Sequence, residues 1–152
     1  MARGLPKLVK YVLEEDRNLP EAEQTVWFIK PKTLHESNET TKHYLKSVKR
    51  SGEDIKDLDV EQADIADIAS FKISVKRIEN YAFPDFYYDE HEAIKKQANE
   101  VEAVDGNTYF YVPVIESDAL LTDVCKSLDP RSLKEIADAA NDYSKLKEGL
   151  KK

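Results

Sequence analysis

The Asp105-Gly106 dipeptide constrains the fold of this chain more than any other feature of the sequence. Asp-Gly is a favoured two-residue turn between antiparallel strands, and the residues on both sides of it alternate in polarity. The resulting register pairs Val101 with Phe110, Glu102 with Tyr109, and Ala103 with Thr108. One face of the predicted hairpin carries Val101, Ala103, Phe110, Val112 and Val114, and the other carries Glu100, Glu102, Tyr109 and Tyr111. Because a one-residue slip would mix these two sets, the pattern specifies the register.

Two more strands are predicted near the N-terminus. Residues 7–13 form a short one, and residues 25–30 form a second, because Thr-Val-Trp-Phe-Ile is β-branched and aromatic and stops at Pro31. Apolar side chains alternate to both sides of this second strand, so we expect it to be covered on both faces. Pro113 has no N–H to donate, so we expect it at an edge position or at the end of its strand.

The longest apolar stripe in the chain predicts a helix from Val60 to Ala82. The helix would end before Pro84, and its apolar stripe recurs at steps of three and four through Ile65, Ile68, Phe71, Val75, Ile78 and Ala82. An earlier helix is predicted to begin with Ser37 or Asn38 as its cap and to run to about residue 50. These two segments would supply the first helices packed on the sheet.

Three shorter helices are predicted in the second half of the chain. After an aromatic connector at residues 83–88, residues 89–98 are expected to add a short helix. Ser117 or Asp118 begins the next helix. Asp129-Pro130 opens the last one, because Asp accepts hydrogen bonds from the first free N–H groups and Pro is favoured at the first helical position.

Together these elements predict a single α+β domain over residues 1–152. A small, mainly antiparallel sheet, made of the two N-terminal strands and the hairpin at Asp105-Gly106, would be packed by four to five helices. Residues 1–6 are expected to extend from the domain, and residues 145–152 to form a lysine-rich tail. No window approaches a membrane span, so no membrane association is expected.

The sequence contains no catalytic or metal-binding motif that we recognise. His35, His43 and His91 have neither an HExxH pattern nor a Cys or carboxylate at a ligand spacing. Cys125 is the only cysteine and falls in an apolar helical segment, where a thiol behaves as a small hydrophobe. We therefore predict no catalytic residue, no cofactor and no metal. The chain is expected to act by binding other proteins, without enzymatic activity.

Charge is unevenly distributed along the chain. The formal net charge of -7 disfavours binding to nucleic acid, because neutralising phosphates needs a surplus of Lys and Arg. Residues 40–52 carry basic residues and no acid. Residues 53–67 carry Lys56 and the acidic residues Glu53, Asp54, Asp57, Asp59, Glu61, Asp64 and Asp67. Blocks of opposite sign can pair within one molecule, or they can pair between copies and steer an assembly.

Tyrosines raise the same choice between an internal and an intermolecular role. Four of them occur where the core pattern does not demand burial, and tyrosine is a favoured interface residue because it supplies a large rigid area with a polar tip. Ordinary half-buried tyrosines would explain them equally well. The candidate interface residues are Lys46, Lys49, Arg50, Asp57, Asp64, Asp67, Tyr87, Tyr88, Tyr109 and Tyr111.

Three segments resemble small proteins encoded among the tail genes of tailed bacteriophages, including tail-assembly chaperones. Residues 16–31 (DRNLPEAEQTVWFIKP) are similar to an acidic LPxxEQT lead into an aromatic strand and a KP turn. Residues 75–81 (VKRIENY) are similar to the end of a long helix. Residues 133–137 (LKEIA) together with 143–146 (YSKL) resemble a closing helix. No catalytic residue carries over from the resemblance.

The resemblance implies a role in tail or head–tail morphogenesis, as a tail-assembly chaperone or a small structural component. The partners would be other phage structural proteins, copies of this chain, or both. The protein would act in the host cytoplasm during assembly or in the virion. An alternative is an acidic phage accessory protein that binds and inhibits a host factor. An acidic face spaced like phosphates would favour the alternative, whereas opposed acidic and basic faces would favour self-assembly.

Overall fold

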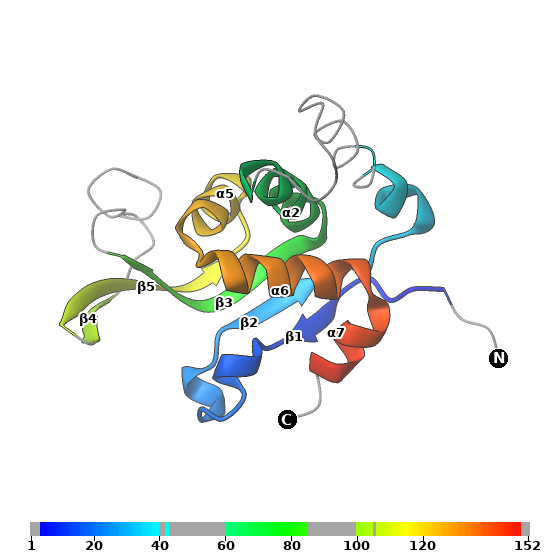
Figure 1. The fold of residues 1–152 in the computed structure, drawn as a ribbon. Coiled ribbons are helices and arrows are strands. Elements are labelled where there is room, and N and C mark those ends of the chain that lie inside the picture. The colour runs from blue at the N-terminus through cyan, green and yellow to red at the C-terminus, as the bar shows by residue number, and fades with distance from the viewer. Residues whose placement is uncertain (1–3, 40–41, 43–59, 85–99, 105, 150–152) are drawn as a thin grey trace.

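The computed structural model of the protein describes residues 4–39, 42, 60–84, 100–104 and 106–149 (Figure 1). Residue 105, the predicted helix at residues 89–98 and most of the helix predicted to end near residue 50 lie outside these ranges. The described residues form an α+β fold, as the sequence predicts.

The sheet has five strands, and all of its pairings are antiparallel. The strand order is β1-β2-β3-β5-β4, which makes β3 the central strand. Short 3-10 helices at Glu14–Asp16 and Glu21–Glu23 connect the first two strands. The strands are β1 (Val9–Tyr11), β2 (Val26–Ile29), β3 (Val75–Pro84), β4 (Glu100–Val104) and β5 (Asn107–Ile115).

The helices form a layer on one side of this sheet. Figure 1 shows α2, α5 and α6 on the same side, and α7 beside the edge strand β1. These helices are α2 (Val60–Ser74), α5 (Asp118–Ser127), α6 (Pro130–Asn141) and α7 (Tyr143–Gly149). The strand at residues 25–30 was expected to be covered on both faces, and the described helices cover one of them. Within the described residues, Trp27 and Ile29 lie under the helices, and Val26 and Phe28 lie on the other side half-buried.

Aromatic side chains fill the space between the sheet and the helices. The Trp27 ring meets the edges of Phe71 and Tyr81, with ring centroids 6.1 and 5.9 Å apart, and Tyr81 meets Phe83 at 4.9 Å. Such edge-to-face contacts are favourable beyond the area that they bury. Phe71 is 1% exposed, which agrees with its predicted place in the apolar stripe of α2.

The C-terminal helices begin where the sequence predicts. The Ser117 side chain accepts a hydrogen bond from the Leu120 N–H, and the Asp129 carboxylate accepts one from the Arg131 N–H, with Pro130 at the first helical position. The expected C-terminal tail differs from the structure, because residues 145–149 belong to α7 and its Leu146 is fully buried.

The hairpin register is confirmed. Val101 pairs with Phe110, Glu102 with Tyr109, and Ala103 with Thr108, and Gly106 has the positive φ (80°) that the turn requires. One part of the facial assignment is wrong, since Val112 is fully buried whereas Val114 is 38% exposed. Pro113 lies between these two valines. It follows Tyr111, the last β5 residue that pairs with β4, so β3 is the only described strand beside β5 at this point.

The predicted helix from Val60 to Ala82 ends eight residues early, at Ser74, and the chain continues directly as β3. Val75, Ile78 and Tyr81 nevertheless all face the core, at a spacing of three that is normal for a helix. Two irregularities in β3 create this spacing, because each one reverses the alternation of side chains.

The first irregularity is at Lys76. Ile29 pairs with Val75 and Phe28 with Arg77, so one extra residue lies between the two pairs on β3. The second is at Asn80, whose backbone has a φ of 63° and lies opposite Pro113 in the register. The Asn80 side chain donates hydrogen bonds to the Ala22 and Gln24 carbonyls at 3.1 and 3.3 Å. These bonds hold the left-handed conformation, which asparagine tolerates better than most residues.

Candidate protein-binding face

The side of the sheet that α2, α5 and α6 leave uncovered is composed mainly of apolar and aromatic residues. This open face consists of Lys10, Val26, Phe28, Arg77, Glu79, Ala82, Pro84, Tyr109, Tyr111 and Val114, assigned by strand register and burial, together with the β4 positions Glu102 and Glu100, which pair with Tyr109 and Tyr111. A sheet face that meets only water is normally polar, in alternation with an apolar buried face. The composition of the open face therefore differs from that of a sheet face which meets only water.

Tyr109 and Tyr111 lie at one end of the open face, which we call the tyrosine end. Tyr109 pairs with Pro84, and Tyr111 pairs with Ala82. Their neighbours Phe83 and Val112 point to the opposite side, where both are fully buried. Since directly paired residues share a face, the two tyrosines lie side by side with small apolar neighbours. Both tyrosine side chains are half-buried.

Phe28 lies at the opposite end of the open face, between the side chains of Lys10 and Arg77. We call these three residues the basic end. The Lys10 ammonium and the Arg77 guanidinium each lie 5.6 Å from the centre of the Phe28 ring. Register explains the arrangement, because Lys10 pairs with Phe28 and Phe28 pairs with Arg77. Arg77 also forms ion pairs with Glu79, at 3.8 Å, and with Glu116. Its charge is therefore balanced locally, while Lys10 extends from the edge strand.

The described part of the structure assigns none of the remaining candidate interface residues to this face. Lys46, Lys49, Arg50, Asp57, Tyr87 and Tyr88 lie outside the described residues. Asp64 lies on α2, and the structure describes only its backbone. Asp67, further along α2, lies close enough to buried Lys32 for its charge to raise the pKa of the lysine. At this one position, an acidic residue of the 53–67 block interacts with a cation that lies outside the basic block at residues 40–52.

Lys32 is a buried cation that the sequence patterns did not identify. It is 8% exposed, and its ammonium donates to the Ser70 hydroxyl at 2.7 Å and to the Asn141 side-chain carbonyl at 2.6 Å. Burial lowers the pKa of Lys32 to about 8, against the opposing effect of the Glu36 and Asp67 charges. The residue connects the segment after β2 to α2 and to the C-terminal end of α6, where a cation is favourable.

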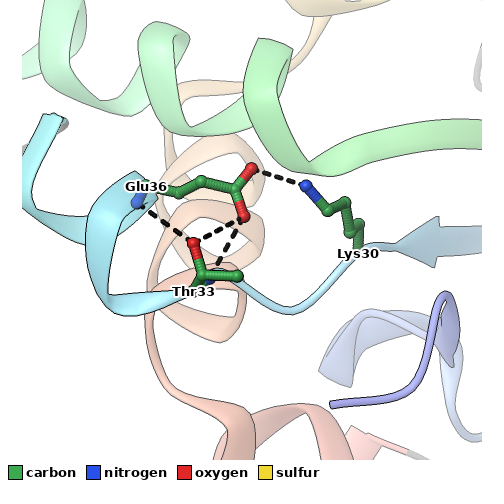
Figure 2. Close-up of polar contacts among 3 residues, drawn as sticks. All are labelled: Lys30, Thr33 and Glu36. Carbon is green, nitrogen blue, oxygen red and sulfur yellow. Dashed lines mark hydrogen bonds and ion pairs between the residues drawn. The ribbon is translucent and has the colours of Figure 1, made fainter. Parts of the chain in front are cut away.

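The segment next to Lys32 carries a helix cap that was also missed (Figure 2). The Thr33 hydroxyl accepts from the Glu36 N–H at 3.3 Å, and the Glu36 carboxylate accepts from the Thr33 N–H at 3.1 Å. The predicted cap at Ser37 or Asn38 is therefore wrong, and residues 34–39 are already helical. The Thr-Leu-His-Glu spacing of a capping box was the available signal.

Glu36 has a further partner, the Lys30 ammonium, at 2.6 Å (Figure 2). The hydrogen bonds from Lys30 and from the Thr33 backbone hold the pKa of the Glu36 carboxyl below its usual range. The Thr33–Glu36 hydrogen bonds and the Lys30–Glu36 ion pair both fix the chain between β2 and the helix that follows it. We interpret them as structural, since each polar atom is used within the fold.

A second polar cluster joins the β1–β2 connection to α6. The Tyr11 hydroxyl donates to the Glu135 carboxylate at 2.6 Å, and the Arg17 guanidinium lies 5.5 Å from the Tyr11 ring. Burial and the hydrogen bond to Glu135 raise the pKa of Tyr11 far above its usual value. The Glu14 N–H also donates to Glu135, at 3.1 Å. This cluster too has its polar groups paired within the fold.

The described residues hold no group of three or more His, Cys, Asp and Glu side chains placed to bind a metal ion. Burial raises the pKa of the Cys125 thiol, which opposes formation of a reactive thiolate. A cleft of about 260 Å³ lies between the end of α2 and the start of α5. It is lined by apolar residues and by the charged residues Lys72, Lys76, Glu116 and Asp118. It is smaller than the usual range for a small-molecule site.

A scan of protein-family models, a search of curated proteins and a search of solved structures each found no match to this chain. In the part of the chain that the structure describes, no helix combines the length and the apolar character needed to cross a lipid bilayer.

Proposed function

We propose that this protein is a non-enzymatic binding protein in tailed-phage morphogenesis, and that it contacts its partner through the open face. The observation that carries the binding role is the composition of that face, in which Tyr109, Tyr111, Phe28 and Val114 occupy positions that would be polar in a solvated sheet. Aromatic residues, tyrosine above all, supply much of the affinity at protein–protein interfaces.

The phage setting rests on the sequence resemblance. Residues 16–31 keep the expected arrangement, since their acidic lead precedes the aromatic strand β2. Residues 133–137 and 143–146 are helical, although they lie on two successive helices, α6 and α7, instead of on one closing helix. Residues 75–81 do not support the resemblance in the same way, because they lie in β3 instead of at the end of a helix. The proposal therefore draws on the first and third segments.

The test is co-expression of the tagged protein with products of its neighbouring genes. We expect one tail or connector protein to co-purify with the unmodified chain. The double variant Tyr109→Ser/Tyr111→Ser should lose that partner while keeping its unfolding midpoint within a few degrees, since both side chains are only half-buried. Retention of the partner by the double variant would remove the open face from the interaction.

Tyr143→Ser is the matched control. Tyr143 is also half-buried, but it lies on α7 under the Lys147 ammonium, which is 4.9 Å from its ring. We expect this variant to keep the partner. Equal loss of the partner in the control and in the double variant would show that the binding responds to general destabilisation and not to the open face.

A further inference from the structure

The cleft between the end of α2 and the start of α5 contains two lysines that the fold itself does not use. Lys72 lies in the last turn of α2, and Lys76 is the second residue of β3. Both are exposed, and neither forms an ion pair or a side-chain hydrogen bond with another residue that the structure describes. In a chain with a formal net charge of -7, two neighbouring cations without carboxylate partners call for an explanation.

Lys76 reaches the cleft through the irregularity in β3. Val75 and Lys76 are successive residues and both line the cleft, although successive side chains of a regular strand point to opposite faces. Lys76 is the extra residue between the pairs that β3 forms with β2, and a bulge of this kind turns a side chain to a new direction. The distortion of the sheet therefore brings a second cation to the cleft that already contains Lys72.

The acidic residues of the cleft are stabilised by other groups. Glu116 forms an ion pair with the Arg77 guanidinium. Asp118 lies in the first turn of α5, where the positive end of the helix dipole favours a carboxylate. The two lysines are thus the charges left for a ligand. A carboxylate can accept charge-assisted hydrogen bonds from both ammonium groups.

The size and the apolar lining of the cleft suit one apolar side chain. The volume of about 260 Å³ is below the usual range for a small-molecule site. Phe71 and Val75 are buried beneath it, and the half-buried Leu121 lines it from α5. Single side chains that fill a pocket supply much of the affinity at protein interfaces. The cleft therefore combines a place for one apolar group with cations for a carboxylate beside it.

We infer that this cleft binds the C-terminal residue of a partner protein, with an apolar side chain against Phe71 and Leu121 and the terminal carboxylate on Lys72 and Lys76. A chain end carries both groups on one residue. An internal segment would need room for the chain to enter and to leave, and the cleft is too small for that. The inference goes beyond the proposed function, since none of the residues that line the cleft belongs to the open face.

NMR titration of the full chain with short peptides tests the inference. The probe is the acetylated pentapeptide Gly-Ser-Gly-Ser-Leu with a free C-terminal carboxylate. We expect it to shift backbone amide signals at the end of α2 and the start of α5, with a dissociation constant on the order of 0.1–1 mM. The same peptide with a C-terminal amide, and the peptide that ends in serine, should each bind roughly tenfold more weakly.

A fourth peptide separates the two sources of a carboxylate. It places Leu-Asp in the middle of a glycine–serine sequence and ends in an amide, so its carboxylate belongs to an internal side chain. We expect it to bind as weakly as the amidated pentapeptide. Binding as tight as that of the free C-terminus would overturn the assignment to a chain end.

Variants of the cleft test the residues. Lys72→Gln/Lys76→Gln should weaken binding of the free-carboxylate peptide roughly tenfold and leave the weaker binding of the amide unchanged. Lys134→Gln/Lys145→Gln removes two exposed lysines from α6 and α7 and is the matched control, which should bind as the unmodified protein does. Thr122→Phe keeps both lysines but fills the cleft from a half-buried position, and should abolish binding. Thermal unfolding establishes that each variant is folded.

Three outcomes would overturn the inference. They are the absence of shifts at the end of α2 and the start of α5, equal binding of the carboxylate and the amide, and equal weakening by the two double lysine variants. The open-face variant Tyr109→Ser/Tyr111→Ser keeps this test separate from that of the proposed function. It should lose the co-purifying partner and still bind the peptide, so each proposal can fail without the other.

Discussion

The two faces of the sheet differ at adjacent residues of the same strand. Trp27 on β2 is 1% exposed and is surrounded by aromatic rings beneath the helices. Phe28, the next residue, is half-buried between Lys10 and Arg77 on the open face. Both are large aromatic side chains, but only Trp27 has its packing completed by the fold. Apolar residues on the covered face are explained by stability, and those on the open face are the ones that we propose to bind a partner.

Replacing a phenylalanine with alanine on each face should give the largest difference in the loss of stability. Phe71→Ala on the covered side should lower the free energy of unfolding by about 3–5 kcal/mol, because it leaves a cavity beside Trp27. Phe28→Ala on the open face should lower it by less, about 1–2 kcal/mol, since it removes two cation–ring contacts and a side chain that is only half-buried. Urea unfolding of the two variants measures both values, and similar losses would mean that the open face is also part of the core.

A smaller difference in the loss of stability is expected between threonine substitutions at Val112 and at Val114 on β5. Val112→Thr places a hydroxyl in the fully buried layer and should cost roughly 1–3 kcal/mol. Val114→Thr, at a position that is 38% exposed, should change the free energy of unfolding by less than about 0.5 kcal/mol. Because these residues are two apart in one strand, regular alternation would make them equivalent. Equal costs would therefore contradict the change of facing at Pro113.

The pH dependence of stability should report the buried cation on the covered side. The pKa of Lys32 is about 8 in the folded chain, below its ordinary value of 10.5, so the unfolded chain binds more protons between these two pH values. Stability then rises with pH across this range, by linkage. Relative to Lys32→Met, the unmodified protein should gain on the order of 1 kcal/mol between pH 7.5 and pH 9.5. Parallel unfolding curves for the two proteins across this range would contradict the lowered pKa.

Local signals in the sequence were sufficient for much of the fold. The turn at Gly106 determines which residues pair across β4 and β5, and Ser117 and Asp129 supply the caps of α5 and α6 within one turn of the chain. Each of these features depends on residues that are neighbours in sequence. Their physical cause is therefore present in a short window, and reasoning from residue types identifies it.

The identity of β3 depends on residues far away in sequence. Asn80 keeps its left-handed backbone because its side chain donates to the carbonyls of Ala22 and Gln24, more than fifty residues earlier. Lys32 is similar, since its partners Ser70 and Asn141 come from α2 and α6. No periodicity within a single segment contains these contacts.

Only part of the candidate site could be predicted from the sequence. Tyr109 and Tyr111 were identified from the hairpin register, which assigns them to the face opposite Phe110. The role of Lys10 and Phe28 was not identified, because the strand that carries Phe28 was expected to be covered on both faces. Which side of a strand the helices cover is a property of the whole topology, and alternation of side chains alone does not contain it.

The direct passage from α2 into β3 has a consequence for how the chain folds. Ser74 ends the helix and Val75 begins the strand, with no loop residue between them. Before β2 and β5 are in place, the spacing of Val75, Ile78 and Tyr81 offers an amphipathic continuation of the helix. Residues 75–84 are therefore expected to sample helical structure early in folding and to convert when their strand partners arrive. That conversion would be slower than local helix formation, because its contacts are distant in sequence.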